Sequence, residues 1–327
     1  MKAFEYASPS SVEEAIAALA VEGGAAALAG GIDLLSLMKD GVESPKRVVN
    51  LKGIKALKGI IYDSRKGLQI GALTTIEELL ADRRVQSEYP ALAQAAQGVR
   101  SAQIQAVGTV GGDLCQRPRC WYYRSGYGLL GIYNGKSMAP EGDNRYHAIL
   151  GNAGPAYFVS PSSFAPALIT LDAIVQIAGP KGKRDLPVQQ FFRIPTKEGE
   201  KEHSLDSSEI VTGVLVPPAA KIKNAIYEVH QKQSLDWPLV AAAVALEMDG
   251  RVVRKARVAL GHVAPIPWPA PAAEQVLAGK PVTESLAEQA GQAAVEGARP
   301  LSGNAYKVRL GRVAVKRAVL RAAGMEV

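Results

Sequence analysis

The spacing of apolar and polar residues over the first hundred positions predicts short helices that alternate with short strands. An amphipathic stretch at residues 12–19 follows two serines and begins with acidic residues, which predicts a helix capped by Ser10 or Ser11. The same reasoning predicts helices at 34–38, 74–80 and 90–98, and strands at 48–51 and 68–72.

The second half of the chain continues this mixed pattern and then changes. A helix is predicted at 164–171 and a strand at 173–177, followed by a hairpin turn at Gly182. Pro217-Pro218 marks a predicted domain boundary. Beyond this boundary, antiparallel strands are predicted at 225–229, 240–248 and 252–261, with a turn at 249–250, and two alanine-rich helices from about residues 272 and 306.

These elements indicate an α+β fold with two domains. The first is expected over 1–218 and the second, a smaller α/β domain with an antiparallel sheet, over 222–327. Residues 115–155 are dense in Gly, Pro, Tyr and Arg and have little periodicity, so a long irregular insertion is expected there. Long loops within compact domains usually serve a function or are disordered.

Two glycine pairs stand about eighty residues apart, in AGGIDLL (29–35) and TVGGDL (109–114). Each follows an apolar or small-residue run, as a loop leaving a strand would. Glycine lets the backbone lie directly against a ligand, and successive N–H groups in such a loop form a concave donor cluster for phosphate oxygens. Two such loops suit a dinucleotide, although neither is the Gly-x-Gly-x-x-Gly motif of a Rossmann fold.

Each of these features also has a purely structural interpretation. A single glycine pair is typical of a plain tight turn. Asp33 could orient the first loop or simply cap the helix that follows it. Ser162 and Ser163 could contact an adenosine group, and they are also placed to cap the helix that starts at Phe164.

Composition narrows the class of protein. Of the 327 residues, 47% are hydrophobic and 21% charged, which is typical of a globular chain. The net charge of +7 is scattered, and its densest cluster, 181–184, is expected at a solvated hairpin tip, so we do not expect nucleic-acid binding. No apolar stretch is long enough to span a membrane and no export signal is recognisable, so a cytoplasmic protein is expected, unless a signal-bearing partner exports it.

Only Cys115 and Cys120 are present, which excludes a fold held by disulfides, and both thiols are expected to be inert. The four histidines are dispersed and follow no metal-binding spacing. No triad or general base is apparent. We therefore predict neither a catalytic residue nor a metal site on this chain.

Several motifs occur in the order of one known family. They are AGGIDL (29–34), GVRSAQI (98–104), GTVGGDL (108–114), PSSFAPAL (161–168), ALGHVAPIP (259–267) and NAYKV (304–308). Together they resemble the FAD-binding, or medium, subunits of molybdenum hydroxylases, the family that includes carbon monoxide dehydrogenase, xanthine dehydrogenase and aldehyde oxidoreductase. The resemblance covers essentially the whole chain.

The resemblance implies an FAD-dependent oxidoreductase subunit whose cofactor lies between subdomains of about 1–58 and 59–218. The residues implied to bind FAD are Leu28, Ala29, Gly30, Gly31, Ile32, Asp33, Leu34, Thr109, Val110, Gly111, Gly112, Asp113, Ser162 and Ser163. The implied partners are a [2Fe-2S] small subunit, a molybdopterin large subunit that carries the substrate chemistry, and an electron acceptor such as NAD, oxygen or ferredoxin.

The insertion narrows the resemblance to one branch. LCQRPRCWYYR (114–124) and NRYHAILG (144–151) resemble the flavin subunits of aldehyde oxidoreductase and 4-hydroxybenzoyl-CoA reductase, which carry an iron–sulfur cluster on four cysteines here. Only Cys120 matches that pattern; the other three positions fall near Leu129, Met138 and Ala156. His147 is interpreted as too isolated to replace a ligand. No iron–sulfur cluster is therefore expected.

Five positions depart from the family pattern. Ile32 stands for Thr, Asp113 for Asn, Gln105-Ala106 for Arg-Asn, Ser163 for Asp and Glu228 for Lys. A carboxylate at 113 is expected to repel a pyrophosphate mildly. Arg117, Arg119 and Arg124 could contact phosphates or a partner, or form a solvated loop. Two alternatives therefore stand beside the electron-transfer subunit: a flavin-free scaffold of the same complex, and a self-contained flavin oxidase.

Overall fold

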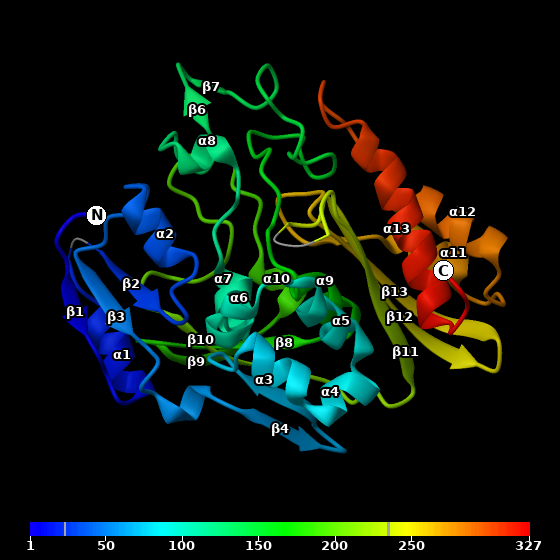
Figure 1. Cartoon of the computed structure of the whole chain (residues 1–327), viewed down its shortest axis with the longest axis horizontal. Coiled ribbons are helices and arrows are strands. Elements are labelled where there is room, and N and C mark those ends of the chain that lie inside the picture. Colours follow the sequence, from blue (N-terminus) through cyan, green and yellow to red (C-terminus); the bar gives the residue numbers. More distant parts are fainter. Residues whose placement is uncertain (23, 234–235) are drawn as a thin grey trace.

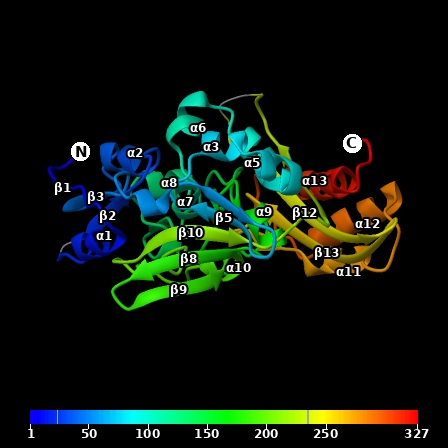
Figure 2. The same ribbon diagram turned by 90° about the horizontal axis from the view of Figure 1, so that it is seen from below.

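The computed structural model describes residues 1–22, 24–233 and 236–327, which form three units along the long axis of the molecule (Figures 1 and 2). The first unit is a parallel sheet in the order β1-β3-β2, made of Glu5–Ala7, Arg47–Asn50 and Ala25–Leu28. Helices α1 (Val12–Leu19) and α2 (Leu34–Lys39) connect these strands, as parallel pairing requires. Ser11 caps α1 by accepting a hydrogen bond from the Glu14 N–H at 3.2 Å, as predicted.

The second unit is a five-stranded antiparallel sheet in the order β4-β5-β10-β8-β9. Its strands are β4 (Ile60–Asp63), β5 (Gly67–Gly71), β10 (Ile210–Val216), β8 (Ile174–Gly179) and β9 (Gly182–Pro187). Between the first two units runs the 3-10 turn η1 (Lys55–Leu57). The central strand β10 was not predicted, because Gly213 and a bulge between Val211 and Gly213 interrupt its alternation.

Short helices cover this sheet, and all but α6 contribute buried residues to the main apolar core, together with the strands. They are α3 (Ile76–Ala81), α4 (Arg83–Glu88), α5 (Pro90–Gly98), α6 (Ala102–Val107), α7 (Val110–Cys115), α9 (Ala165–Thr170) and α10 (Val188–Phe191). The predicted capping pattern of α3 is present as a reciprocal pair between Thr75 and Glu78.

The third unit is an antiparallel sheet with helices packed on it. Its strands are β11 (Ile222–Val229), β12 (Val240–Asp249), β13 (Val252–Gly261) and β14 (Trp268–Pro269), in that spatial order. Its helices are α11 (Pro271–Leu277), α12 (Glu284–Ala294) and α13 (Tyr306–Ala322). The predicted strands are confirmed, but the prediction of two helices was wrong because α12 was missed. Gly291 weakened its pattern, yet a Cβ there would come within 2.3 Å of the Arg312 carbonyl oxygen, so glycine permits close packing on α13.

The insertion is largely irregular, as predicted, apart from helix α8 (Trp121–Arg124) and a small hairpin of β6 (Ile132–Tyr133) and β7 (Lys136–Ser137). It projects from the second unit in Figure 1. The Trp121 ring packs edge-on against Tyr122, Tyr146 and His147, with ring centroids 5.5–6.2 Å apart. Aromatic packing therefore holds the insertion together, as expected.

Lys307 of α13 joins the insertion to the third unit. Its buried ammonium donates hydrogen bonds to the carbonyls of Tyr146 at 2.9 Å, His147 at 3.3 Å and His262 at 2.8 Å. Burial lowers the pKa of this side chain to about 7. A neutral amine has only two N–H groups, so donating to all three carbonyls requires the charged ammonium. Burial disfavours this charged form of Lys307.

We expect Lys307→Met to lower the free energy of unfolding by about 2 kcal/mol, because three buried carbonyls lose their donor. Chemical denaturation of both chains measures the difference. Lys316→Met is the matched control on the same helix: Lys316 pairs with exposed Glu284 and Glu288, so its loss should cost less than about 1 kcal/mol. Equal costs for the two variants would contradict a joining role for Lys307.

Candidate functional site

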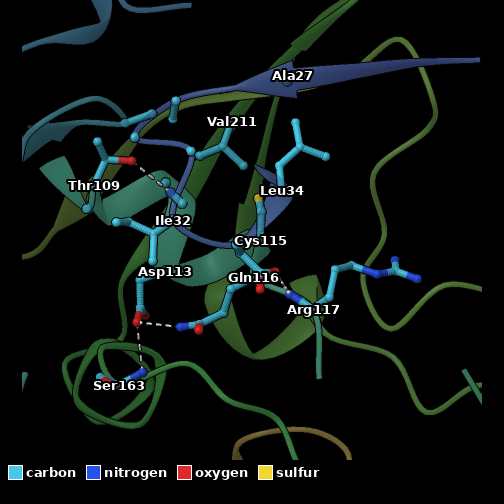
Figure 3. Close-up of a pocket in the computed structure, with 18 of the residues that line it drawn as sticks. Ala27, Ile32, Leu34, Thr109, Asp113, Cys115, Gln116, Arg117, Ser163 and Val211 are labelled. Carbon is cyan, nitrogen blue, oxygen red and sulfur yellow. Dashed lines mark hydrogen bonds between the residues drawn. The ribbon is translucent and has the colours of Figure 1, made fainter. Parts of the chain in front are cut away.

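A cavity of about 500 Å³ opens where the three units meet, within the size range of small-molecule sites. Residues of both glycine segments and of the insertion line it (Figure 3). Residues of the third unit, among them Glu228 and Trp237, line it as well. The two segments that the sequence singled out are therefore brought to one site, although they belong to different units.

The first glycine segment follows strand β2 and leads into α2, as predicted. Gly31 has φ of +82°, a conformation that side chains rarely adopt. Gly30 lies against α6, where a Cβ would come within 1.9 Å of the Val107 carbonyl oxygen. Within the described ranges, the N–H groups of Gly30, Gly31 and Ile32 donate to no other group. They are open donors at the cavity wall, which fits a phosphate.

The second glycine segment differs from the prediction. It is not a loop after a strand but helix α7, which follows helix α6. Its N–H groups already have acceptors: Val110 donates to Thr74 O at 3.0 Å, Gly111 to Ala72 O at 2.9 Å and Gly112 to Thr109 Oγ1 at 3.1 Å. These bonds hold α7 against β5, so the segment gives the cavity a closely approachable wall rather than a second set of open donors.

Asp33 precedes α2 but makes no side-chain capping bond to it, so the capping interpretation is wrong. Its carboxylate instead accepts hydrogen bonds from the Arg117 backbone N–H and from Arg124 Nη2, both at 2.7 Å. The residue therefore ties the first glycine segment to the insertion, which is the orienting role considered from sequence.

Asp113 joins α7 to the turn before α9. Its buried carboxylate accepts hydrogen bonds from the Ser162 hydroxyl, from the N–H groups of Ser163 at 3.0 Å and Phe164 at 3.1 Å, and from Gln116 Nε2 at 2.9 Å (Figure 3). Burial raises its pKa to about 6, and these hydrogen bonds oppose the rise. Asp113 lines the cavity, yet both of its carboxylate oxygens accept hydrogen bonds from protein donors; the expected repulsion of a pyrophosphate stays a prediction.

Of the serine pair, Ser162 is confirmed as a cap. Ser162 Oγ accepts a hydrogen bond from the Ala165 N–H at 3.0 Å, at the start of α9. Ser163 also lines the cavity, so it is the member of the pair placed near a ligand.

Glu228 of β11 brings a buried carboxylate to the cavity wall from the third unit. Its side chain is only 8% exposed and lies 3.0 Å from His230 Nε2. It packs directly on Gly98, where a Cβ would come within 2.0 Å of Oε2. Among the described residues its Oε1 has no hydrogen-bond partner. The sequence marked Glu228 only as a departure from the family pattern, which has Lys at this position. In the structure this carboxylate is buried at the cavity wall.

Arg117, Arg119 and Arg124 of the insertion do not form a solvated loop. Arg117 Nη1 lies 3.0 Å from Glu202 Oε2, and Arg117 Nε donates to the Tyr123 hydroxyl at 2.9 Å. Arg124 pairs with Asp33. All are at least partly buried, and Arg117 and Arg119 line the cavity.

The two cysteines lie in different surroundings. Cys115 lines the cavity, and burial raises the pKa of its thiol to about 12, so it is a neutral wall group. Cys120 packs with Leu129 and Ala156 in a small apolar cluster, so three of the four positions that the resemblance singled out lie together, and only one of them is a cysteine. The interpretation of His147 as isolated was wrong, because its Nε2 lies 3.2 Å from Cys120 Sγ.

Sequence reasoning missed several residues that line the cavity, notably Trp237 and Arg100. Trp237 lies between β11 and β12, and only the folding of the third unit against the second brings it to the site. No local motif marks it.

Comparison with known proteins places the chain. Residues 2–219 match the FAD binding domain in molybdopterin dehydrogenase, and residues 225–322 match the CO dehydrogenase flavoprotein C-terminal domain. The chain belongs to this family of molybdenum hydroxylase flavoprotein subunits. The resemblance and the fold class expected from sequence are thereby confirmed.

Relatives of this flavoprotein subunit match along most of its length. The FAD-binding subunit of an aldehyde oxidoreductase from Escherichia coli strain K12 is 34% identical over 280 residues, which cover 85% of this chain and 86% of that one. A carbon monoxide dehydrogenase medium chain from Hydrogenophaga pseudoflava is 29% identical, with coverage of 97% and 96%. A solved structure of carbon monoxide dehydrogenase from the latter organism matches with a TM-score of 0.76 at 30% identity, covering 99% and 98%.

The chain is thus a subunit of an FAD-dependent oxidoreductase of the xanthine, aldehyde and carbon monoxide dehydrogenase type. In the part of the sequence that the structure describes, no helix is long and apolar enough to cross a membrane. Over the same residues, no three His, Cys, Asp or Glu side chains are grouped as a metal site would need.

Proposed function

We propose that this flavoprotein subunit transfers electrons from a [2Fe-2S] small subunit to an acceptor such as NAD, oxygen or ferredoxin, while a molybdopterin large subunit carries the substrate chemistry. The observation that carries the proposal is the single cavity of about 500 Å³ bounded by all three units, with open amide donors on one wall. FAD supplies the redox chemistry when bound.

The chain's own residues hold and orient the cofactor. We propose that the set predicted from sequence, residues 28–34, 109–113, 162 and 163, forms the FAD site. The open N–H groups of Gly30, Gly31 and Ile32 donate to phosphate oxygens, and Asp33 keeps their loop in position through the insertion. The second glycine segment has no side chains at Gly111 and Gly112, so the cofactor can lie close to its backbone.

Partner chains are supported by the relatives. Two of them are named as carbon monoxide dehydrogenase medium chains, which implies other chains in those enzymes. The division of this chain at residues 218–222, the identity of its partners, and its cytoplasmic location stay predictions.

An absorption spectrum of the purified chain, before and after addition of FAD, tests the binding part of the proposal. We expect flavin bands near ~370 and ~450 nm, as for any protein-bound flavin, with no iron. The electron-transfer part is tested by adding the two partner subunits and an oxidisable aldehyde or purine without oxygen. Bleaching near ~450 nm only when both partners are present supports it.

The same experiment separates the two alternatives. A chain that binds both partners but never takes up FAD is the scaffold. A chain that is bleached by a small substrate without either partner is the self-contained oxidase. Either result would overturn the proposed electron-transfer role.

A further inference from the structure

Arg119 stands where the three parts of the site meet. It belongs to the insertion, between α7 and α8, and it lines the cavity. Its Nη2 lies 3.7 Å from Asp33 Oδ1 in the first glycine segment, and its guanidinium carbon lies 4.4 Å from the centroid of the Trp237 ring of the third unit. One side chain thus touches the insertion, the first glycine segment and the third unit.

The charge of Arg119 is incompletely compensated. The Asp33 carboxylate is already bound at 2.7 Å by Arg124 Nη2 and by the Arg117 N–H, and it stands beyond hydrogen-bond distance from Arg119. Among the described residues, the buried Nε of Arg119 has no partner at all. Burial lowers its pKa to about 10, and Asp33 offsets only part of this effect.

Another arginine of the cavity wall, Arg117, shows the contrast. Arg117 has Glu202 at 3.0 Å and the Tyr123 hydroxyl at 2.9 Å, and its pKa is raised rather than lowered. The positive charge of Arg117 therefore has a counter-charge within hydrogen-bond distance, whereas the Asp33 carboxylate stands 3.7 Å from Arg119 Nη2.

A dinucleotide needs donors for two phosphates. The first glycine segment has open N–H groups, but those of the second segment are used within the protein. A guanidinium group matches phosphate oxygens with two parallel N–H donors, and a partly buried one binds an anion more strongly than an exposed one does. Arg119 lines the same cavity as the open donors, and its Nη2 lies 3.7 Å from the side chain of Asp33, the residue that follows them.

We propose that Arg119 is a ligand of the FAD pyrophosphate, brought by the insertion to the cavity beside the first glycine segment. The assignment rests on the proposed function. It gives the insertion a role in this chain that does not depend on a metal cluster: it carries a cation to a cavity wall that also holds the carboxylates of Asp113 and Glu228.

The test compares three probes on the full chain freed of FAD. FAD and riboflavin are titrated by fluorescence, and inorganic pyrophosphate by its effect on the melting temperature. We expect Arg119→Gln to weaken FAD binding by about 10- to 100-fold, to abolish stabilisation by pyrophosphate and to leave riboflavin, which has no phosphate, within twofold. Arg119→Lys keeps the charge but loses the two parallel N–H donors of the guanidinium. Its affinity for FAD should therefore lie between those of the unmodified chain and of Arg119→Gln.

Arg145→Gln is the matched control. Arg145 lies in the same insertion but is 59% exposed and paired with Asp143 at 2.6 Å, so all three probes should bind as they do to the unmodified chain. Because FAD and riboflavin are titrated on the same variant, the ratio of their affinities is not affected by a general loss of stability.

Two outcomes would overturn the assignment alone: FAD affinity unchanged in Arg119→Gln, or FAD and riboflavin weakened equally, which would mean that Arg119 only shapes the cavity. If the unmodified chain binds no FAD, the proposed function fails first and the assignment with it. The two failures are therefore distinguishable.

Discussion

Gly30→Ala is expected to weaken FAD binding by at least ~100-fold and to lower the free energy of unfolding by about 3 kcal/mol. The added Cβ would come within 1.9 Å of the Val107 carbonyl oxygen and 2.7 Å of its carbonyl carbon. Backbone atoms of a helix cannot move aside as a flexible side chain can. The first glycine segment must therefore separate from α6, and its open N–H groups move with it. Titration with FAD and chemical denaturation measure the two effects.

Gly154→Ala is the matched control for this substitution. Gly154 lies in the insertion, and a Cβ there would meet nothing within 4 Å. Its replacement should change neither FAD affinity nor stability by more than about 0.5 kcal/mol. If Gly30→Ala binds FAD as well as Gly154→Ala does, the first glycine segment is a structural turn and the phosphate site lies elsewhere in the cavity.

Local patterns in the sequence are enough to predict most of the regular elements. Strands β12 and β13 are long and are joined by a tight turn at Gly250-Arg251, one residue beyond the turn predicted at 249–250. Helix α3 has both halves of its capping box, so periodicity and turn chemistry agree in these elements. The same reasoning fails for β10, where a central strand is bulged at Gly213. In that case pairing with two neighbouring strands, rather than local preference, fixes the conformation.

The site was predictable in its location but not in its chemistry. The glycine pairs mark positions where backbone must approach something closely, and the structure brings both to one cavity. What each pair approaches is not encoded locally. Gly30 makes room for the Val107 carbonyl and Gly111 for Ala72, so both conformations are set by protein contacts. Which amides stay open for a ligand depends on acceptors that only the folded chain supplies.

The acidic departures show a second limit of sequence reasoning. Asp113 was interpreted as a charge beside a phosphate because its neighbours in the chain are glycines. The structure gives it four protein donors, three of them from residues about fifty positions away. The resemblance noted an exchange at 113 and another at 163 as separate events, yet the Asp113 carboxylate accepts a hydrogen bond from the Ser163 N–H. The two positions are in contact.

Asp113→Ala is expected to lower the free energy of unfolding by about 3 kcal/mol, because the buried N–H groups of Ser163 and Phe164 lose their acceptor. Asp63→Ala is the control: Asp63 also accepts from two backbone N–H groups, those of Arg65 and Lys66, but it is exposed. Water can replace its carboxylate, so that variant should lose less than about 1 kcal/mol. Similar losses at both positions would refute a burial-dependent role for Asp113.

The pH dependence of stability gives an independent check. The pKa of Asp113 is raised to about 6, so the folded chain holds this proton more tightly than the unfolded chain does. Its contribution to stability is therefore fully present below about pH 4 and is lost as the pH rises through about 6. Asp113→Ala should remove this slope from the unfolding free energy, whereas Asp63→Ala should leave it in place.

The exchange of acidic residues can be tested as a pair. Asp113→Asn with Ser163→Asp moves the carboxylate to the position that the family pattern favours. Alone, Asp113→Asn places an amide nitrogen opposite a backbone N–H, and Ser163→Asp sets a second carboxylate beside the first, so each should destabilise the fold. Together they should cost at least ~1 kcal/mol less than the sum of the single changes, because contacting sites are coupled. If the change in unfolding free energy of the double variant equals the sum of the two single changes, the two departures are independent. The carboxylate at 113 then does not compensate for the loss of the one at 163.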